Sequence, residues 1–102
     1  MGKTIHTKSV DNLFDAILKL KTRDECYKFF EDVCTINEIL SFAQRMEVAR
    51  MLMAGKTYLE ISEETGASTA TISRVNRSLT YGADGYKIVF ERLGSEKQEN
   101  EA

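Results

Sequence analysis

Residues 36–54 constrain the fold most strongly, because they form one long helical segment that is apolar on most of its surface. Thr35 and Glu38 make a capping box at its start, and Gly55 is the residue type that ends helices in the left-handed conformation. Its apolar residues cover far more than one stripe: Ile36, Ile39, Leu40, Phe42, Ala43, Met46, Val48, Ala49, Met51, Leu52 and Met53. Such a helix needs neighbours on most sides.

A chain of 102 residues supports one domain and has few other helices with which to surround this segment. A second copy of the chain would supply the missing cover, so we expect a homodimer. A tightly wrapped monomeric bundle remains the alternative. The hydrophobic content of 42% and the absence of proline favour a compact all-α domain.

The remaining helices follow from apolar spacing and caps. The i, i+3, i+4 pattern predicts helices over 10–20 and 84–93, and a capping box at Thr22 predicts a second helix reaching Val33. We expect a flexible N-terminal arm over 1–8, a single all-α domain over 9–93, and a disordered acidic tail over 94–102.

Several classes of function lack support in the sequence. No apolar run is long enough for a membrane span and no signal peptide is visible, so we expect a cytoplasmic protein. Cys26 and Cys34 fit no zinc spacing and read as free thiols, and His6 has no second ligand near it. No catalytic constellation or phosphate-binding glycine loop is present, so we expect neither an enzyme nor a metal or cofactor site.

The stretch TYLEISEETGASTATISRVNRSL, residues 57–79, has the joint pattern of a helix-turn-helix. Ile61 in the first helix and Ile72 and Val75 in the second are placed to pack together, and Gly66 lies at the turn, where positive φ is needed. Such units bind DNA, although they also occur as packing units and protein docking surfaces.

Projecting the second helix at about 100° per residue separates an apolar face from an outward face that is small at its N-terminal end and basic further on. This order suits a helix that approaches base edges in the major groove and meets phosphates beyond them. The residues predicted to contact double-stranded DNA are Ser68, Thr69, Ala70, Thr71, Ser73, Arg74 and Arg77. We therefore expect a sequence-specific DNA-binding protein.

Acidic residues on the first helix, Glu60, Glu63 and Glu64, and a net charge of -2 fit this expectation less well. Few phosphate contacts imply weak nonspecific affinity and a shallow salt dependence. An alternative is that the helix-turn-helix is a protein-interaction module that docks on a basic partner.

The run from Thr35 to Leu79 resembles the bacterial Trp repressor, most specifically in GASTATISR, residues 66–74, and in the long preceding helix that ends at Gly55. From about residue 10 to residue 93 the chain looks like the Trp repressor-like family. The resemblance implies a six-helix chain in an intertwined homodimer. It also implies a transcriptional regulator, acting as a repressor, whose two helix-turn-helix units enter successive major grooves.

The resemblance also implies a candidate effector pocket. Thr35, Arg45 and Arg74 occupy the places of the family's corepressor-binding threonine and two arginines, but Val75 stands where the family has glycine. A branched side chain there would clash with an indole ring, so we do not expect a response to tryptophan. Either a smaller anionic effector binds the arginines, or Val75 fills the space, which its core position favours. Arg45 could instead pair with an acid on a partner helix.

Overall fold

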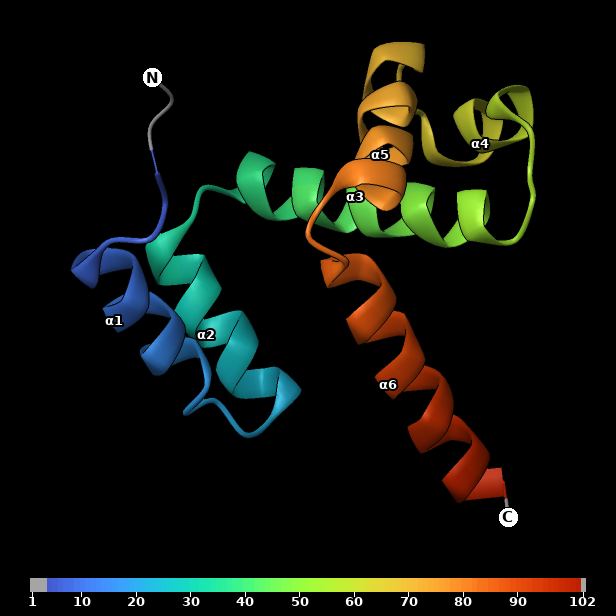
Figure 1. Ribbon diagram of the computed structural model, residues 1–102. Coiled ribbons are helices and arrows are strands. Elements are labelled where there is room, and N and C mark those ends of the chain that lie inside the picture. The colour runs from blue at the N-terminus through green and yellow to red at the C-terminus, as the bar shows by residue number, and fades with distance from the viewer. Residues whose placement is uncertain (1–3, 102) are drawn as a thin grey trace. The chain divides into compact units, whose positions relative to one another are not determined.

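The computed structural model describes residues 4–101, which form six α-helices and no strand (Figure 1). The helices are α1 (Lys8–Ile17), α2 (Arg23–Val33), α3 (Ile36–Met53), α4 (Tyr58–Thr65), α5 (Thr69–Tyr81) and α6 (Gly85–Glu101). The chain divides into two compact units, Met1–Ile39 and Leu40–Ala102. The predicted all-α fold with six helices is confirmed.

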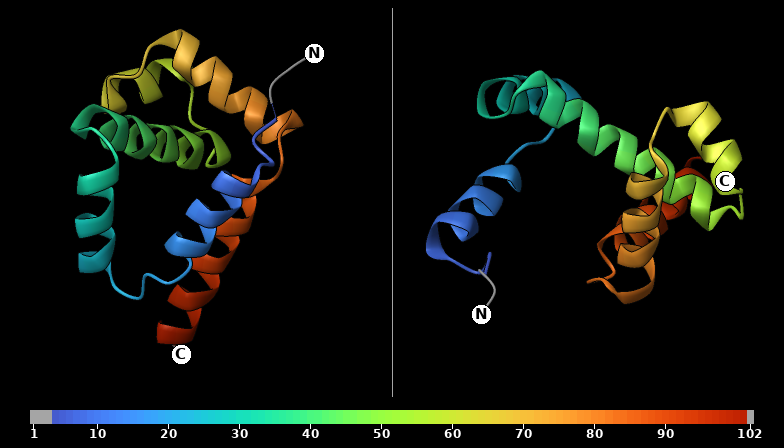
Figure 2. Two further views of the ribbon diagram at one scale, coloured as in Figure 1. Left: turned by 90° about the vertical axis from the view of Figure 1, so that its left-hand side faces the viewer. Right: turned by 90° about the horizontal axis from the view of Figure 1, so that it is seen from above.

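In the first unit, a loop between α1 and α2 turns the chain back on itself (Figures 1 and 2). The hydroxyl of Thr22 caps α2 by accepting the N–H of Glu25 at 3.1 Å. Helix α1 begins earlier than predicted, because the hydroxyl of Thr7 accepts the N–H of Val10 and starts the helix at Lys8. Neither helix contains a fully buried residue, so their apolar stripes are at most partly covered within the chain.

In the second unit, α4 and α5 lie on one side of α3 while α6 leads away on the other (Figures 1 and 2). Its buried core joins α3 to the helix-turn-helix and consists of Val48, Ala49, Met51, Ile61, Ala67, Ile72 and Val75. Leu52, Leu79, Tyr86 and Phe90 pack against this cluster. The core therefore holds the two short helices on the long one.

Both ends of α3 have the predicted caps. Thr35 and Glu38 exchange their capping bonds, at 2.8 Å from the N–H of Thr35 to the Glu38 carboxylate and at 3.1 Å from the N–H of Glu38 to the Thr35 hydroxyl. Gly55 has φ +83°, and the N–H of Lys56 donates to the carbonyl of Met51 at 3.0 Å. This is the Schellman geometry that satisfies the last carbonyls of a helix.

Much of the apolar surface of α3 is uncovered within this chain. Only Val48, Ala49 and Met51 of this helix are buried, whereas Leu40, Phe42 and Met53 are 60%, 50% and 51% exposed. The long helix thus has more apolar surface than this chain covers, as the sequence indicates.

The ends of the chain differ from expectation. Lys8 belongs to α1, so any N-terminal arm is shorter than residues 1–8, and residues 1–3 lie outside the described part. Residues 94–101, for which we expected disorder, continue α6 as helical backbone to Glu101. Packing does not require glycine at position 94 in this helix, because a Cβ there would meet nothing within 4 Å. Residue 102 lies outside the description.

Candidate nucleic-acid interface

The turn between α4 and α5 is built around Gly66, whose φ of +73° is left-handed. Its N–H donates to the carbonyl of Ser62 at 2.9 Å, which ends α4. The hydroxyl of Thr65 donates to the carbonyl of Ile61 at 2.7 Å and accepts the N–H of Ala67 at 3.1 Å. The turn is thus closed by short hydrogen bonds, and Gly66 has the role predicted for it.

The pair of helices is fixed to α3 by both polar and apolar contacts. The side-chain amide of Gln44 in α3 donates to the carbonyl of Thr65 at 3.1 Å. Ile61 and Ile72 are fully buried and Val75 is 2% exposed, so the three predicted core positions of the motif are confirmed. Helix α5 is therefore held at its apolar face, and its opposite face is left outward.

Helix α5 begins at a cap made by Ser68, whose hydroxyl accepts the N–H of Thr71 and donates to the Thr71 hydroxyl, both at 3.1 Å. Six of the seven residues predicted to contact DNA are exposed, and Thr71 is partly buried beside the cap. The exposed six are Ser68, Thr69, Ala70, Ser73, Arg74 and Arg77. The structure thus leaves the predicted reading face open within this chain.

The acidic residues of α4 are partly compensated by cations at the end of α3. Lys56 lies 3.9 Å from the Glu60 carboxylate. Arg50 forms a two-point contact with Glu47, at 2.9 and 3.1 Å, and this hydrogen bonding raises the pKa of Arg50, with a smaller contribution from the charge of Glu64. Lys56 therefore partly compensates the charge of Glu60, which reduces the negative field that a DNA backbone would meet.

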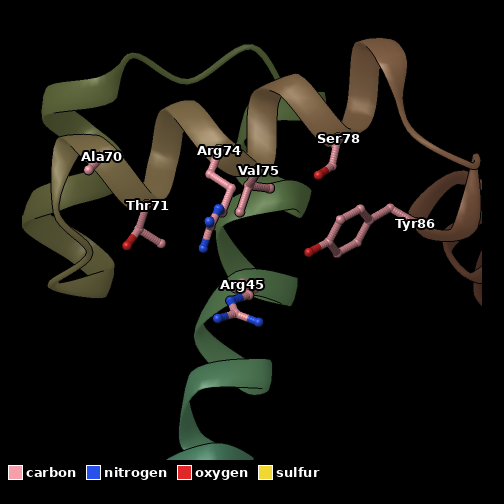
Figure 3. A pocket seen from close by; sticks show the side chains of 7 residues that line it. All are labelled: Arg45, Ala70, Thr71, Arg74, Val75, Ser78 and Tyr86. Atoms are coloured by element: carbon pink, nitrogen blue, oxygen red, sulfur yellow. The ribbon is translucent and has the colours of Figure 1, made fainter. Parts of the chain in front are cut away.

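A pocket of about 620 Å³ lies between α3, α5 and the start of α6 (Figure 3). Figure 3 shows Arg74 reaching from α5 toward Arg45 of α3, with the hydroxyl of Tyr86 pointing toward the space between them. The lining residues are Arg45, Ala70, Thr71, Arg74, Val75, Ser78 and Tyr86. Two guanidinium groups and three hydroxyls make this a site of hydrogen-bond donors, without a carboxylate in its wall.

Three of the four residues predicted for an effector pocket, Arg45, Arg74 and Val75, line this one space. Thr35 belongs to the first unit, where its hydroxyl caps α3. Among the described residues no ion pair involves Arg45; its guanidinium lies over the ring of Phe42, 5.9 Å from the centroid. That contact fits a cation–π interaction.

Two lining residues were not singled out from the sequence. Ser78 follows Arg74 by four residues, so helical spacing alone places it on the same side of α5. Tyr86 packs against the core, with its ring stacked near Phe90 at 6.5 Å between centroids. Its contribution to the pocket depends on how α6 returns toward α5, which no local pattern reveals.

The sequence model of the Trp repressor protein family matches residues 8–94. The chain belongs to the Trp repressor family. A crystal structure of a TrpR-like protein from Eubacterium eligens ATCC 27750 is 70% identical, with a TM-score of 0.86, over 88% of this chain and 93% of that one. A proposed Trp repressor from Staphylococcus aureus is 51% identical, also with a TM-score of 0.86, over 91% of this chain and 96% of that one.

The chain is also similar to the uncharacterized protein YerC of Bacillus subtilis strain 168. It is 58% identical over 93 residues, which cover 91% of this chain and 89% of YerC. The likenesses thus extend over the whole six-helix domain rather than the helix-turn-helix alone. Among the described residues, no helix has both the length and the apolar character needed to cross a membrane.

Proposed function

We propose that this protein is a sequence-specific DNA-binding transcriptional regulator, acting as a repressor, that reads the major groove with α5. The observation that carries the proposal is the outward face of α5, where small side chains near the cap are followed by Arg74 and Arg77, all exposed. Small residues let the helix approach base edges, and arginines beyond them reach a guanine edge or a phosphate. Membership of the Trp repressor family supports the same function.

The active species in this proposal is a homodimer. In the first unit Phe14 is 49% and Leu18 79% exposed, and in the second unit Leu40 is 60% and Leu93 52% exposed. Apolar surface of this extent is typical of a chain that is completed by a partner. Two copies would present two α5 helices to successive major grooves of a pseudo-palindromic site.

The regulator does not respond to tryptophan in this proposal. Val75 is 2% exposed and belongs to the buried core, so its packed side chain forms part of the pocket wall at the position where the family has glycine. The alternative, a small anionic effector between Arg45 and Arg74, is tested by titrating the protein with inorganic phosphate and with tryptophan in a calorimeter. Heat of binding from tryptophan would contradict the proposal; heat from phosphate alone would favour the anionic effector.

The test of DNA binding is a shift assay with fragments of the upstream region of the protein's own gene, at low and moderate salt. Arg77→Ala should abolish the shift, because it removes an exposed cation from the reading face. Arg92→Ala makes the same change of charge on α6 and serves as the control. Unchanged affinity of the Arg77 variant would contradict this reading of α5.

The alternative function, a protein-interaction module, is favoured by one surface. On α4, Leu59 is 68% exposed beside the acidic residues Glu60 and Glu63. An exposed apolar side chain among carboxylates suits a basic protein partner better than a phosphate backbone. A Leu59→Ala variant that keeps DNA binding but loses a protein partner would favour this second function. A variant that keeps both DNA binding and its protein partners would remove the support for it.

A further inference from the structure

The outward face of α5 ends in Tyr81, which is not among the residues predicted above to contact DNA. At about 100° per residue, Ala70, Arg74, Arg77 and Tyr81 fall within one narrow sector of the helix, opposite the buried Ile72. Tyr81 is 81% exposed, more than any other large apolar or aromatic residue described. A large aromatic side chain is thus presented to solvent in line with the reading face.

Tyr81 is also part of the wall of a hollow at the C-terminal end of α5. This hollow has a volume of about 250 Å³ and is lined by Arg74, Arg77, Ser78, Tyr81 and Gly82. Its polar side chains are two guanidinium groups and two hydroxyls, all of which can donate hydrogen bonds, and no carboxylate is among them. A group that only accepts hydrogen bonds and carries negative charge matches this set.

The position of Tyr81 along the helix separates it from base readout. Tyr81 follows Ala70 by eleven residues, which at 1.5 Å per residue is about 16 Å along the helix axis. The major groove is about 12 Å wide, so a helix whose first turn meets the base edges carries its last turn past the groove wall. The chemical group that runs along this wall is the phosphate backbone.

We propose that the hollow lined by Arg77, Ser78 and Tyr81 holds one backbone phosphate of the bound duplex, with the Tyr81 hydroxyl and the Arg77 guanidinium donating to its oxygens. The proposal rests on the DNA-binding function proposed above. Arg74 lines both this hollow and the larger pocket beside Arg45, whereas Arg77 lines only the hollow of these two spaces. Arg77 is therefore the principal cation for the phosphate in this proposal.

One effect opposes a phosphate at this place. The C-terminus of a helix carries partial negative charge, and the N–H of Gly82 is already used by the carbonyl of Ser78 at 2.9 Å. The dipole effect is weak and screened at an exposed helix end, whereas hydrogen bonds from charged donors are among the strongest in proteins. The arginine and tyrosine donors therefore decide the preference of the hollow.

The experiment uses the full-length protein and a duplex selected by it from a random library. Affinity and ethylation interference, which detects contacted phosphates, are measured for the wild type, Tyr81→Phe and Tyr81→Ala. Tyr81→Phe removes only the hydroxyl and should weaken binding by about tenfold or more, as expected for the loss of one hydrogen bond to a charged group. It should also abolish interference at one phosphate in each half-site. Tyr27→Phe, the same change at an exposed tyrosine of α2, is the matched control.

The outcomes separate this proposal from the one on which it rests. If the wild type selects no duplex, the proposed DNA-binding function itself fails. If it selects a duplex and both Tyr81 variants keep the wild-type affinity and interference pattern, only the phosphate site at Tyr81 is overturned. A loss in Tyr81→Ala with none in Tyr81→Phe also overturns it, because the hydroxyl would then have no role.

Discussion

Truncation of Val75 tests the inference that its side chain packs in the wall of the pocket beside α5 and holds that helix on the core. Val75 is 2% exposed, and it is both a member of the buried core and a lining residue of the pocket with Arg45 and Arg74. Val75→Ala removes two methyl groups, worth about 0.8 kcal/mol each, and a cavity term brings the expected loss of unfolding free energy to about 2 kcal/mol.

Val75→Gly also removes the buried Cβ, about 0.8 kcal/mol, and adds the poor helix propensity of glycine, about 1 kcal/mol relative to alanine, for a total near 4 kcal/mol. Asn76→Ala and Asn76→Gly provide the matched comparison at the neighbouring exposed position of α5, where the step from alanine to glycine should cost only the propensity difference of about 1 kcal/mol.

The assay is urea unfolding followed by circular dichroism, at one fixed protein concentration because unfolding of a proposed dimer depends on concentration. Both Val75 variants should also bind the selected duplex more weakly, because α5 is less firmly held. A loss below about 0.5 kcal/mol for Val75→Ala would refute the reasoning, since it would mean that the side chain is not packed in the folded protein.

Gly66→Ala should lower the unfolding free energy by about 1–2 kcal/mol, because a Cβ there meets nothing within 4 Å and only the left-handed backbone disfavours it. Gly66→Asn should lower it by less, because asparagine adopts the left-handed conformation more readily than alanine, and equal losses in urea unfolding would contradict this. Thr35→Ala should lower the unfolding free energy by about 1 kcal/mol, because α3 loses its cap. The same urea assay on Thr80→Ala, the same substitution at a threonine that caps no helix, serves as the control. The pKa of Glu38 is lowered from 4.5, first by the backbone hydrogen bond from Thr35 and then by the hydrogen bond of the Thr35 side chain. The Glu38 carboxylate therefore stabilises the fold above pH 4.5, and this contribution is lost as the pH falls through the folded pKa. The difference in unfolding free energy between the wild type and Glu38→Gln should shrink on acidification, and a constant difference would argue against this role of Glu38. At protein concentrations high enough to restore binding of Arg77→Ala, the salt slope should be shallower by about 1, and an unchanged slope would place Arg77 away from phosphate.

Local rules predicted most of the fold. The capping box of Thr35 and Glu38, the left-handed Gly55 and Gly66, and the burial of Ile61 are properties of short sequence windows, and each is found in the structure. Helix α1 starts two residues before the predicted residue 10, because Thr7 acts as its cap.

Features that depend on distant segments were not predictable in the same way. Arg50 pairs with Glu47 within α3, and the charge of Glu64 on α4 also contributes to raising its pKa, an influence that only the packing of α4 onto α3 creates. Tyr86 enters the pocket because of the path of α6, and Tyr81 lines a hollow that forms only where α5 ends at Gly82. Helical periodicity gave the direction of these side chains but not their surroundings.

The central claim, that two copies of α5 read duplex DNA, is tested most directly by selecting duplexes from a random library with the full-length protein and sequencing the bound pool. We predict a pseudo-palindromic site whose half-sites lie about one helical turn, 10–10.5 base pairs, apart. A pool that shows no enriched sequence, or an enriched single site without two-fold symmetry, would contradict it.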